Sequence, residues 1–139
     1  MRQVRESLIV RAPRQGLHEI TGDLGAWLDA QALREGILTV FIRHTSASLL
    51  IQENADPDVQ HDLETWLDRH VPEDATLYRH RAEGPDDMPA HIKSALTQTH
   101  LAIPVGAGRM MLGTWQGVYL FEHRRRPGER ELILHYQGD

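Results

Sequence analysis

The chain has 139 residues, with 20 acidic side chains against 15 basic ones and a net charge of −5 at neutral pH. This length is typical of one domain, so we expect a single domain over residues 1–139. The acidic balance disfavours a general nucleic-acid binder, which needs an excess of Lys and Arg. Because no apolar run is long enough to span a bilayer and no cleavable signal is recognisable, we expect a cytoplasmic protein without a membrane partner.

Cysteine is absent from the sequence, whereas histidine occurs nine times. The absence of cysteine excludes disulfides, thiolate catalysis and cysteine-ligated zinc. A metal site in this chain would therefore have to use imidazole and carboxylate groups.

The chain begins with a change of hydrophobic period. Residues 4–12 alternate loosely between apolar and polar side chains, which predicts a strand with one solvated face. Apolar residues then recur at helical spacing over residues 20–36. We expect a helix there, capped by Thr21 or Asp23 and stopped by Gly36.

Two strands and a helix are predicted next. Residues 37–43 are rich in β-branched and aromatic side chains and indicate a buried strand, and residues 48–53 indicate another. The following helix has the clearest signature, since Asp56 can cap it and Pro57 suits its first turn. Its apolar stripe comprises Val59, Leu63, Trp66, Leu67 and Val71.

The second half of the chain predicts fewer regular elements. Residues 72–87 lack periodicity and indicate a long loop, and a short helix is expected over residues 88–97. Residues 109–124 and 130–137 are typical of strands, and we expect a hairpin between them through residues 125–129. The fold class predicted from this order is α+β, with two or three helices and a mostly antiparallel sheet.

The predicted helix at residue 88 opens with two side chains that suit metal or proton chemistry. Asp87 and His91 are four residues apart and therefore project from the same helix face. The pair can bind a divalent metal or orient the histidine as a general base. The alternative is a capping aspartate beside a surface histidine. His80, in the preceding loop, can fold over the same site.

For other candidate polar residues, a structural role is an alternative to a functional one. His44, followed by Thr45 at a strand end, is as a single residue more often a hydrogen-bonded core histidine than a ligand. Gln116 and Glu122 share a strand face but stand roughly 20 Å apart, so either one is structural or subunits combine. An inward Glu122 needs a cation, and a salt bridge to an arginine is the simpler explanation. The basic run at residues 124–126 is interpreted as a solvated turn.

Four segments together carry a resemblance to a known family: HTSAS, ENADPDV, EGPDDMPAHIK and GTWQGVYLFEHR. In this order they resemble the YjbQ-like family over nearly the whole chain. The resemblance implies a homotrimer of α+β, sandwich-like subunits. It also implies a secondary thiamine-phosphate synthase, which condenses hydroxymethylpyrimidine diphosphate with thiazole phosphate and releases diphosphate, as a weak activity.

Carried onto this sequence, the family's polar cleft would comprise His44, Thr45, Glu53, Asn54, Asp56, Asp87, His91, Thr114 and Gln116. Two residues depart from the family pattern, because Gln52 and Asp87 stand where asparagine is common. The second departure changes the local charge and therefore the metal preference.

The expected roles follow from this cleft. His91 would act as acid or base with Asp87 orienting it, and His44 would assist. A divalent metal, Mg²⁺ or Zn²⁺, would be held by His44, His80, Asp87 and His91. Lys93 and Arg43 can clamp the phosphate of a small phosphorylated metabolite, although both are ordinarily solvated side chains. The alternative function is a non-catalytic trimeric module that binds a metal ion or such a metabolite.

Overall fold

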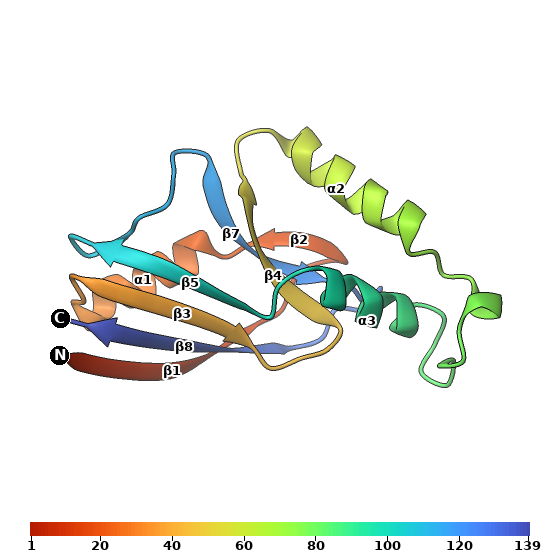
Figure 1. The fold of residues 1–139 in the computed structure, drawn as a ribbon, viewed down its shortest axis with the longest axis horizontal. Helices are drawn as coiled ribbons and strands as arrows, with labels where there is room; N and C mark the ends of the chain where they lie inside the picture. The colour runs from red at the N-terminus through yellow and green to blue at the C-terminus, as the bar shows by residue number, and fades with distance from the viewer.

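Two antiparallel sheets form the framework of the computed structural model, which describes residues 1–139 (Figure 1). The larger sheet has the strand order β1-β8-β3-β5-β6, formed by Arg2–Val10, Arg130–Gly138, Gly36–Ile42, His100–Gly106 and Arg109–Met110. The smaller sheet has the order β2-β7-β4, formed by Gly16–Glu19, Gln116–Glu122 and Ala47–Glu53. This arrangement confirms the predicted α+β class.

The helical elements are α1 (Thr21–Gln31), α2 (Pro57–His70), the 3-10 turn η1 (Ala75–Leu77) and α3 (Asp87–Leu96). Helices α2 and α3 lie toward the end of the molecule opposite the two chain termini (Figure 1). None of the helices is both long enough and apolar enough to cross a membrane.

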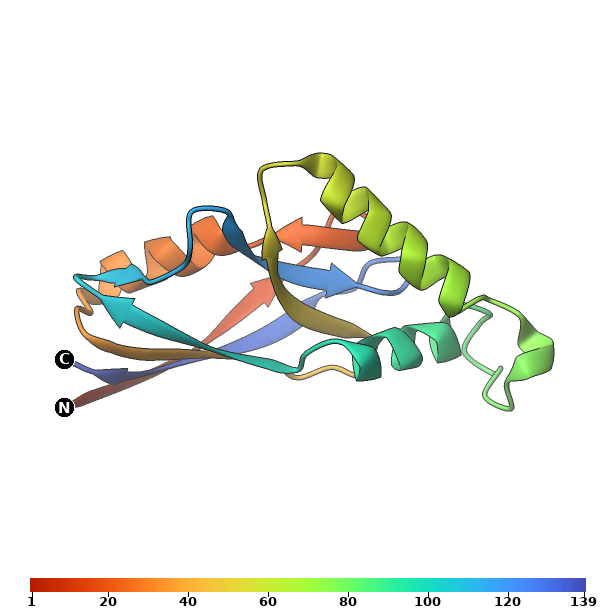
Figure 2. The ribbon, with the colours of Figure 1, turned by 45° about the horizontal axis from the view of Figure 1, so that its top comes forward.

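The main hydrophobic core lies between the two sheets and α1 (Figure 2). Strand β3 shows how the sequence builds it, because Leu38, Val40 and Ile42 are buried while Ile37 and Phe41 are exposed on the opposite face. Successive side chains of a strand point to opposite faces, so one face of the five-stranded sheet meets the core and the other stays open.

A second, smaller core fixes α2 against the outer face of the three-stranded sheet. Leu67 of α2 packs with Leu17, Tyr119 and Phe121. Asp56 caps this helix by accepting a hydrogen bond from the backbone N–H of Asp58 at 2.9 Å, as predicted. One residue of the predicted apolar stripe does not face the core. Trp66 is 55% exposed and stacks on His70 with the ring centroids 3.9 Å apart.

The predicted boundaries of α1 were wrong at both ends. Thr21 is already helical, and its hydroxyl accepts a hydrogen bond from the N–H of Val118 on β7, so it links the helix to the sheet. The helix ends at Gln31 because Ala32 adopts a left-handed conformation and its N–H bonds back to Leu28 and Asp29. Gly36, the expected stop, begins β3 instead.

The predicted C-terminal hairpin is also wrong, because β7 and β8 belong to different sheets. Both edges of β7 are already occupied by β2 and β4, so β8 pairs with β1 and β3 in the other sheet. Two strands, β2 and β5, were not predicted. Pro104 weakens the strand signal of β5, but a proline is tolerated there because β6 pairs only with residues 105 and 106 along that edge.

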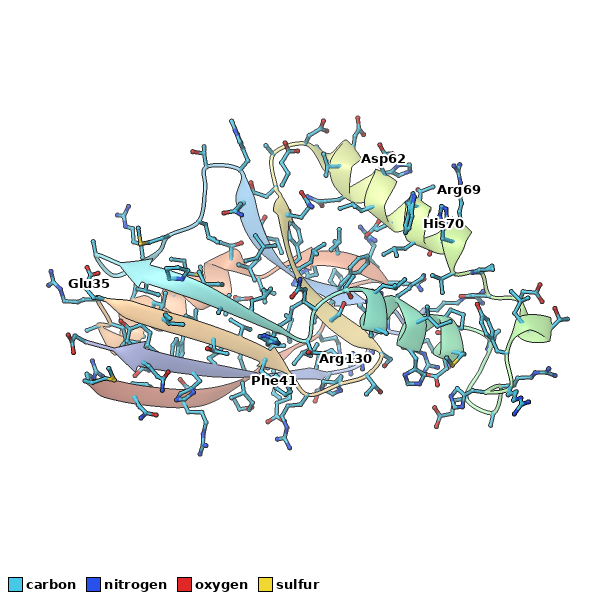
Figure 3. The ribbon with its side chains drawn as sticks, viewed as in Figure 1. Glu35, Phe41, Asp62, Arg69, His70 and Arg130 are labelled. Carbon is cyan, nitrogen blue, oxygen red and sulfur yellow. The ribbon has the colours of Figure 1, made fainter.

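A buried ion pair marks the crossing from β7 to β8. Glu122 accepts two hydrogen bonds from the guanidinium of Arg130, at 2.8 and 2.6 Å, and both residues are buried. Arg130 lies near the β8 end that faces α3 (Figure 3). The predicted salt bridge between Glu122 and an arginine is therefore confirmed, and Glu122 has a structural role.

Candidate metal centre

Two imidazoles, one from the loop before α3 and one from α3 itself, converge on a carboxylate at the start of this helix. The Nε2 atoms of His80 and His91 lie 2.6 and 3.0 Å from the same oxygen, Oδ2 of Asp87. The Asp87 carboxylate is only 3% exposed, whereas both imidazoles reach the surface. A carboxylate oxygen can only accept hydrogen bonds, so a proton or a metal cation must lie between it and each of these nitrogens.

The loop between α2 and α3 folds back to place His80 there. Gly84 makes this reversal with φ = 104°, in the left-handed region that favours glycine. Its carbonyl accepts a hydrogen bond from the N–H of Asp87, where the helix begins. His91 follows one helical turn later, so the spacing of four residues positions its side chain beside Asp87 as the sequence predicted.

Glu83 completes the group. Its Oε2 lies 3.7 Å from His80 Nε2. One ligand atom from each of His80, Glu83, Asp87 and His91 lies within 4.8 Å of the others, an arrangement that can hold one metal ion. Imidazole nitrogens combined with carboxylate oxygens are ligands typical of Zn²⁺.

A carbonyl outside the group fixes the orientation of His91. Its Nδ1 lies 3.0 Å from the backbone oxygen of Thr45. Because a carbonyl only accepts, Nδ1 carries the proton and the lone pair of Nε2 faces the centre when the ring is neutral. A hydrogen bond of this kind on the second nitrogen is a regular feature of metal-binding histidines.

Arg124 supports the carboxylates from the other side. Its Nη1 donates to Oδ1 of Asp87 at 2.5 Å, its Nε to Oδ2 of Asp86 at 3.0 Å, and its Nη2 to the carbonyl of Glu83 at 2.9 Å. The solvated turn predicted for residues 124–126 is therefore wrong at its first residue. The guanidinium matches the fork of carboxylate oxygens at the start of α3.

These contacts keep Asp87 ionised. Burial alone would raise the pKa of Asp87, but the hydrogen bond from His80 and the charges of Arg124 and His91 outweigh it and lower the pKa below the ordinary value. The pKa of Asp86 is likewise lowered, because the hydrogen bonds and charge of Arg124 outweigh the effect of burial. Both carboxylates are thus charged near neutral pH.

A pocket of about 220 Å³ adjoins the group. Its wall is formed by Ala75, Tyr78, His80, Arg81, Gly84 and Pro85. His80 therefore belongs both to the candidate metal centre and to this pocket, and Arg81 supplies a positive charge to the wall. A ligand in this pocket would lie beside the centre.

The family model described as UPF0047 protein YjbQ-like matches residues 6–139. The chain belongs to this YjbQ-like family. It is 52% identical to UPF0047 protein sll1880 of Synechocystis over 99% of this chain and 94% of the relative, and 43% identical to YjbQ of Escherichia coli O157:H7 over 97% and 98%. The solved YbjQ-like protein of Sulfolobus solfataricus P2 has a TM-score of 0.88 over 99% of both chains. Its 20% identity shows the fold alone.

Within this YjbQ-like chain, His44 does not join His80 and His91. Its Nε2 accepts a hydrogen bond from the backbone N–H of Glu131 at 2.8 Å, so the lone pair that a metal would need is already used. Burial, aided by the charge of Arg130, lowers the pKa of His44 and keeps the ring neutral. The geometry matches the hydrogen-bonded histidine that the residue type alone suggested.

Five residues of the predicted cleft lie at the far end of the β4–β7 pair: Glu53, Asn54, Asp56, Thr114 and Gln116. Glu53 pairs with Gln116 there, whereas Ala47 pairs with Glu122 near α3, and six residues of strand separate the two ends by roughly 20 Å. Gln116 accepts a hydrogen bond from the N–H of Gly113, and Thr114 is exposed in the same turn. In one chain the expected cleft is therefore two separate groups.

The residues expected to bind phosphate have other partners. Asn54 donates to Glu19 at 3.1 Å, and Asp56 caps α2. Arg43 forms an exposed salt bridge with Glu131. Thr45 contributes its carbonyl to His91, and Lys93 lies in a separate pocket on the other side of α3.

Sequence reasoning missed Glu83 and Arg124. Glu83 has a signal in hindsight, because residues 83, 87 and 91 are spaced by four, but Gly84 and Pro85 interrupt any helix between the first two. Arg124 has no local signal, since its partners are about 40 positions away in the sequence.

Proposed function

We propose that His80, Glu83, Asp87 and His91 bind one divalent cation, and that this ion binds the diphosphate of a phosphorylated substrate. The observation that carries the proposal is the convergence of two Nε2 atoms on a single carboxylate oxygen. A bound cation would remove the need for protons between these atoms. The ligand set favours Zn²⁺ over Mg²⁺, because Mg²⁺ prefers oxygen ligands and retains its waters.

The proposed reaction is the one that the family resemblance implies. The ring nitrogen of a thiazole phosphate forms a bond to the methylene carbon of hydroxymethylpyrimidine diphosphate. The carbon–oxygen bond to the diphosphate breaks, and its electron pair leaves with the diphosphate. The attacking nitrogen carries no proton to be removed, so the reaction depends chiefly on stabilising the negative charge of the leaving group.

The chain's own residues would contribute in three ways. Arg81 in the adjacent pocket can bind phosphate oxygens that lie beside the centre. Arg124 and the Thr45 carbonyl hold Asp87 and His91 in position. His91 serves better as a ligand than as the acid or base expected from sequence, because both of its nitrogens face fixed partners.

A homotrimer is proposed on the same basis. The two groups of cleft residues lie at opposite ends of β4 and β7, so only neighbouring subunits can combine them. Exposed Ile9, Ile37 and Phe41 on the open face of the five-stranded sheet provide apolar surface that such an assembly can cover.

The experiment for the reaction compares metal-free protein with protein reloaded with Zn²⁺ or Mg²⁺. Both substrates are supplied, and thiamine phosphate is measured. We expect slow product formation that requires metal and falls about 100-fold or more in His80→Ala. His61→Ala, which changes an exposed histidine of α2 outside the group, is the matched control and should keep full activity.

Two results would change the assignment. Equal activity with and without metal would reject the role of the ion. Metal binding without product under any condition would reject the reaction and leave a non-catalytic module that binds a metal ion.

A further inference from the structure

A pocket lies at the end of β4 and β7 away from α3, where the loop after β4 and the loop before β7 run side by side (Figures 1 and 2). Its volume is about 420 Å³, within the roughly 300–1,000 Å³ typical of small-molecule sites. The residues that line it are Ile51, Gln52, Glu53, Trp115 and Gln116. The backbone N–H of Asn54 donates to the carbonyl of Trp115 at 2.9 Å and ties the two loops together.

Trp115 gives this pocket an aromatic wall. It is 62% exposed and belongs to neither hydrophobic core. Ile51, which is half-buried against the main core, adds apolar surface. An exposed indole beside polar groups suits a planar ring, because the ring can stack on its face while its polar edge meets those groups.

Glu53 supplies a hydrogen-bond acceptor with unused capacity. Its Oε2 is buried and has no hydrogen-bond partner, and no cationic side chain lines the pocket. Buried polar atoms are rarely left without a partner, and a carboxylate oxygen only accepts. The residue as a whole is half-buried, so rotation of its side chain can present this oxygen to the donor of a ligand.

Gln116 places a donor next to this acceptor. It pairs directly with Glu53 across β4 and β7, so the two side chains project from the same face of the sheet. Its Oε1 accepts a hydrogen bond from the N–H of Gly113 at 2.8 Å, which fixes the amide and directs Nε2 away from Gly113. An amide nitrogen of this kind only donates, so the pocket offers an acceptor and a donor side by side.

We infer that this pocket binds an aminopyrimidine ring. The ring stacks on Trp115, its exocyclic amino group donates to Glu53, and the adjacent ring nitrogen accepts from Nε2 of Gln116. An amino group beside a ring nitrogen presents this donor and acceptor along one edge. A carboxylate beside an indole also suits a simple cation, but the Nε2 donor of Gln116 would then face a positive charge instead of an acceptor.

The identification of this ring with the pyrimidine of the proposed substrate rests on the proposed function. Within one chain the pocket and the candidate metal centre lie at opposite ends of β4 and β7, roughly 20 Å apart. A neighbouring subunit of the proposed homotrimer would therefore supply the metal centre that meets the diphosphate. Binding of the ring alone needs neither the metal nor the reaction.

The test uses metal-free full-length protein and rings without phosphate, so that neither a metal nor a diphosphate contributes to binding. Hydroxymethylpyrimidine, cytosine and adenine are titrated separately, and binding is followed by calorimetry and by quenching of tryptophan fluorescence. We expect saturable binding with quenching. Saturation by hydroxymethylpyrimidine alone would assign the ring of the proposed substrate, and saturation by all three would assign a general aminopyrimidine site.

A matched ligand tests the polar edge without any change to the protein. Hydroxymethylpyrimidine that lacks its amino group can still stack on Trp115 but brings no donor to Glu53. It should bind at least about tenfold more weakly. This comparison keeps the inference testable if a variant fails to fold.

Three variants test the residues one by one. Glu53→Met should weaken binding at least about tenfold without lowering the urea midpoint, because Oε2 has no partner to lose. Gln116→Glu retains an acceptor for the N–H of Gly113 but replaces the donor, and should weaken binding to a similar extent. Trp115→Leu should weaken binding about tenfold or more. Trp66→Leu, which changes a 55% exposed indole on α2, is the matched control and should leave binding unchanged.

Several results would overturn the inference: no saturation by any of the three rings, equal binding of the ring without its amino group, or unchanged affinity in folded Glu53→Met. Saturation by tetramethylammonium in place of the aminopyrimidines would also overturn it, in favour of a cation site. The proposed function fails separately. Metal titration tests the metal centre with no ring present, and ring binding without product formation would reject the reaction alone.

Discussion

Arg124 Nη1 donates to Asp87 Oδ1 at 2.5 Å, while the other oxygen of the same carboxylate faces the imidazoles of His80 and His91. The arginine therefore fixes the carboxylate from behind and leaves its second oxygen directed at the candidate metal centre. This contact joins the segment after β7 to the start of α3, and so couples the fold to the site.

Arg124→Met should destabilise the protein by about 3 kcal/mol, because it leaves the buried Asp87 carboxylate without its cationic partner. Metal affinity should also fall about 10- to 100-fold. Urea unfolding and metal titration measure the two effects. Arg126→Met is the control, since Arg126 is exposed, and it should change stability by less than about 0.5 kcal/mol. Equal effects of the two variants would contradict the role of Arg124.

Arg130→Met should cost about 3–5 kcal/mol, because Glu122 would remain as an unpaired charge at the crossing between the sheets. The matched control is Arg43→Met, which breaks the exposed pair with Glu131 and should cost about 0.5 kcal/mol. Denaturant midpoints compare the two. If the losses were similar, the buried pair would not hold the crossing together.

Stability should fall as the pH drops from 6.5 toward 3, in part because of His123. Burial lowers the pKa of His123 from its ordinary 6.5 to about 3, so the unfolded chain binds a proton in this window that the folded chain does not. The loss is on the order of 4 kcal/mol across the window. His44, whose pKa is also lowered, acts in the same direction.

The measurement is urea unfolding of metal-free protein at a series of pH values. His123→Gln should lose stability less steeply than the parent protein, whereas His61→Gln should follow the parent because His61 is exposed on α2. An undiminished slope in His123→Gln would show that this histidine is not the source.

Light scattering should give three times the chain mass of 15.9 kDa, as the proposed homotrimer requires. Micromolar protein is measured over a tenfold range of concentration. A single-chain mass throughout would reject the trimer, and with it the idea that neighbouring subunits join Gln116 to the residues around His91.

Local features of the fold were predictable from sequence where one residue type has one structural consequence. Asp56 and Pro57 gave the start of α2, and the β-branched and aromatic side chains of residues 37–43 gave β3, although Ile37 and Phe41 of this expected buried strand are exposed. The pairing of strands was less predictable. Nothing in residues 116–138 shows that β7 is enclosed by β2 and β4, so the adjacent strands suggested a hairpin that the sheets do not contain.

The candidate site likewise combines features that the sequence predicted with features that it did not. The spacing of Asp87 and His91 predicted their shared face, because helix geometry is local. The contact of Arg124 with Asp87 could not be predicted, and neither could the burial of His123 Nδ1 without a hydrogen-bond partner. In both cases the surrounding residues come from segments distant in sequence. His44 was assigned by motif alone, and the hydrogen bond from Glu131 that uses its lone pair depends on the pairing of the five-stranded sheet.

Anomalous diffraction at the zinc edge, from crystals of the protein grown with Zn²⁺, tests the central claim most directly. The account predicts one strong peak about 2.0–2.2 Å from Nε2 of His80, Nε2 of His91 and a carboxylate oxygen of Asp87, and its loss in His80→Ala. A peak located elsewhere, or no peak at these three residues at millimolar Zn²⁺, would contradict the claim that they form a metal centre.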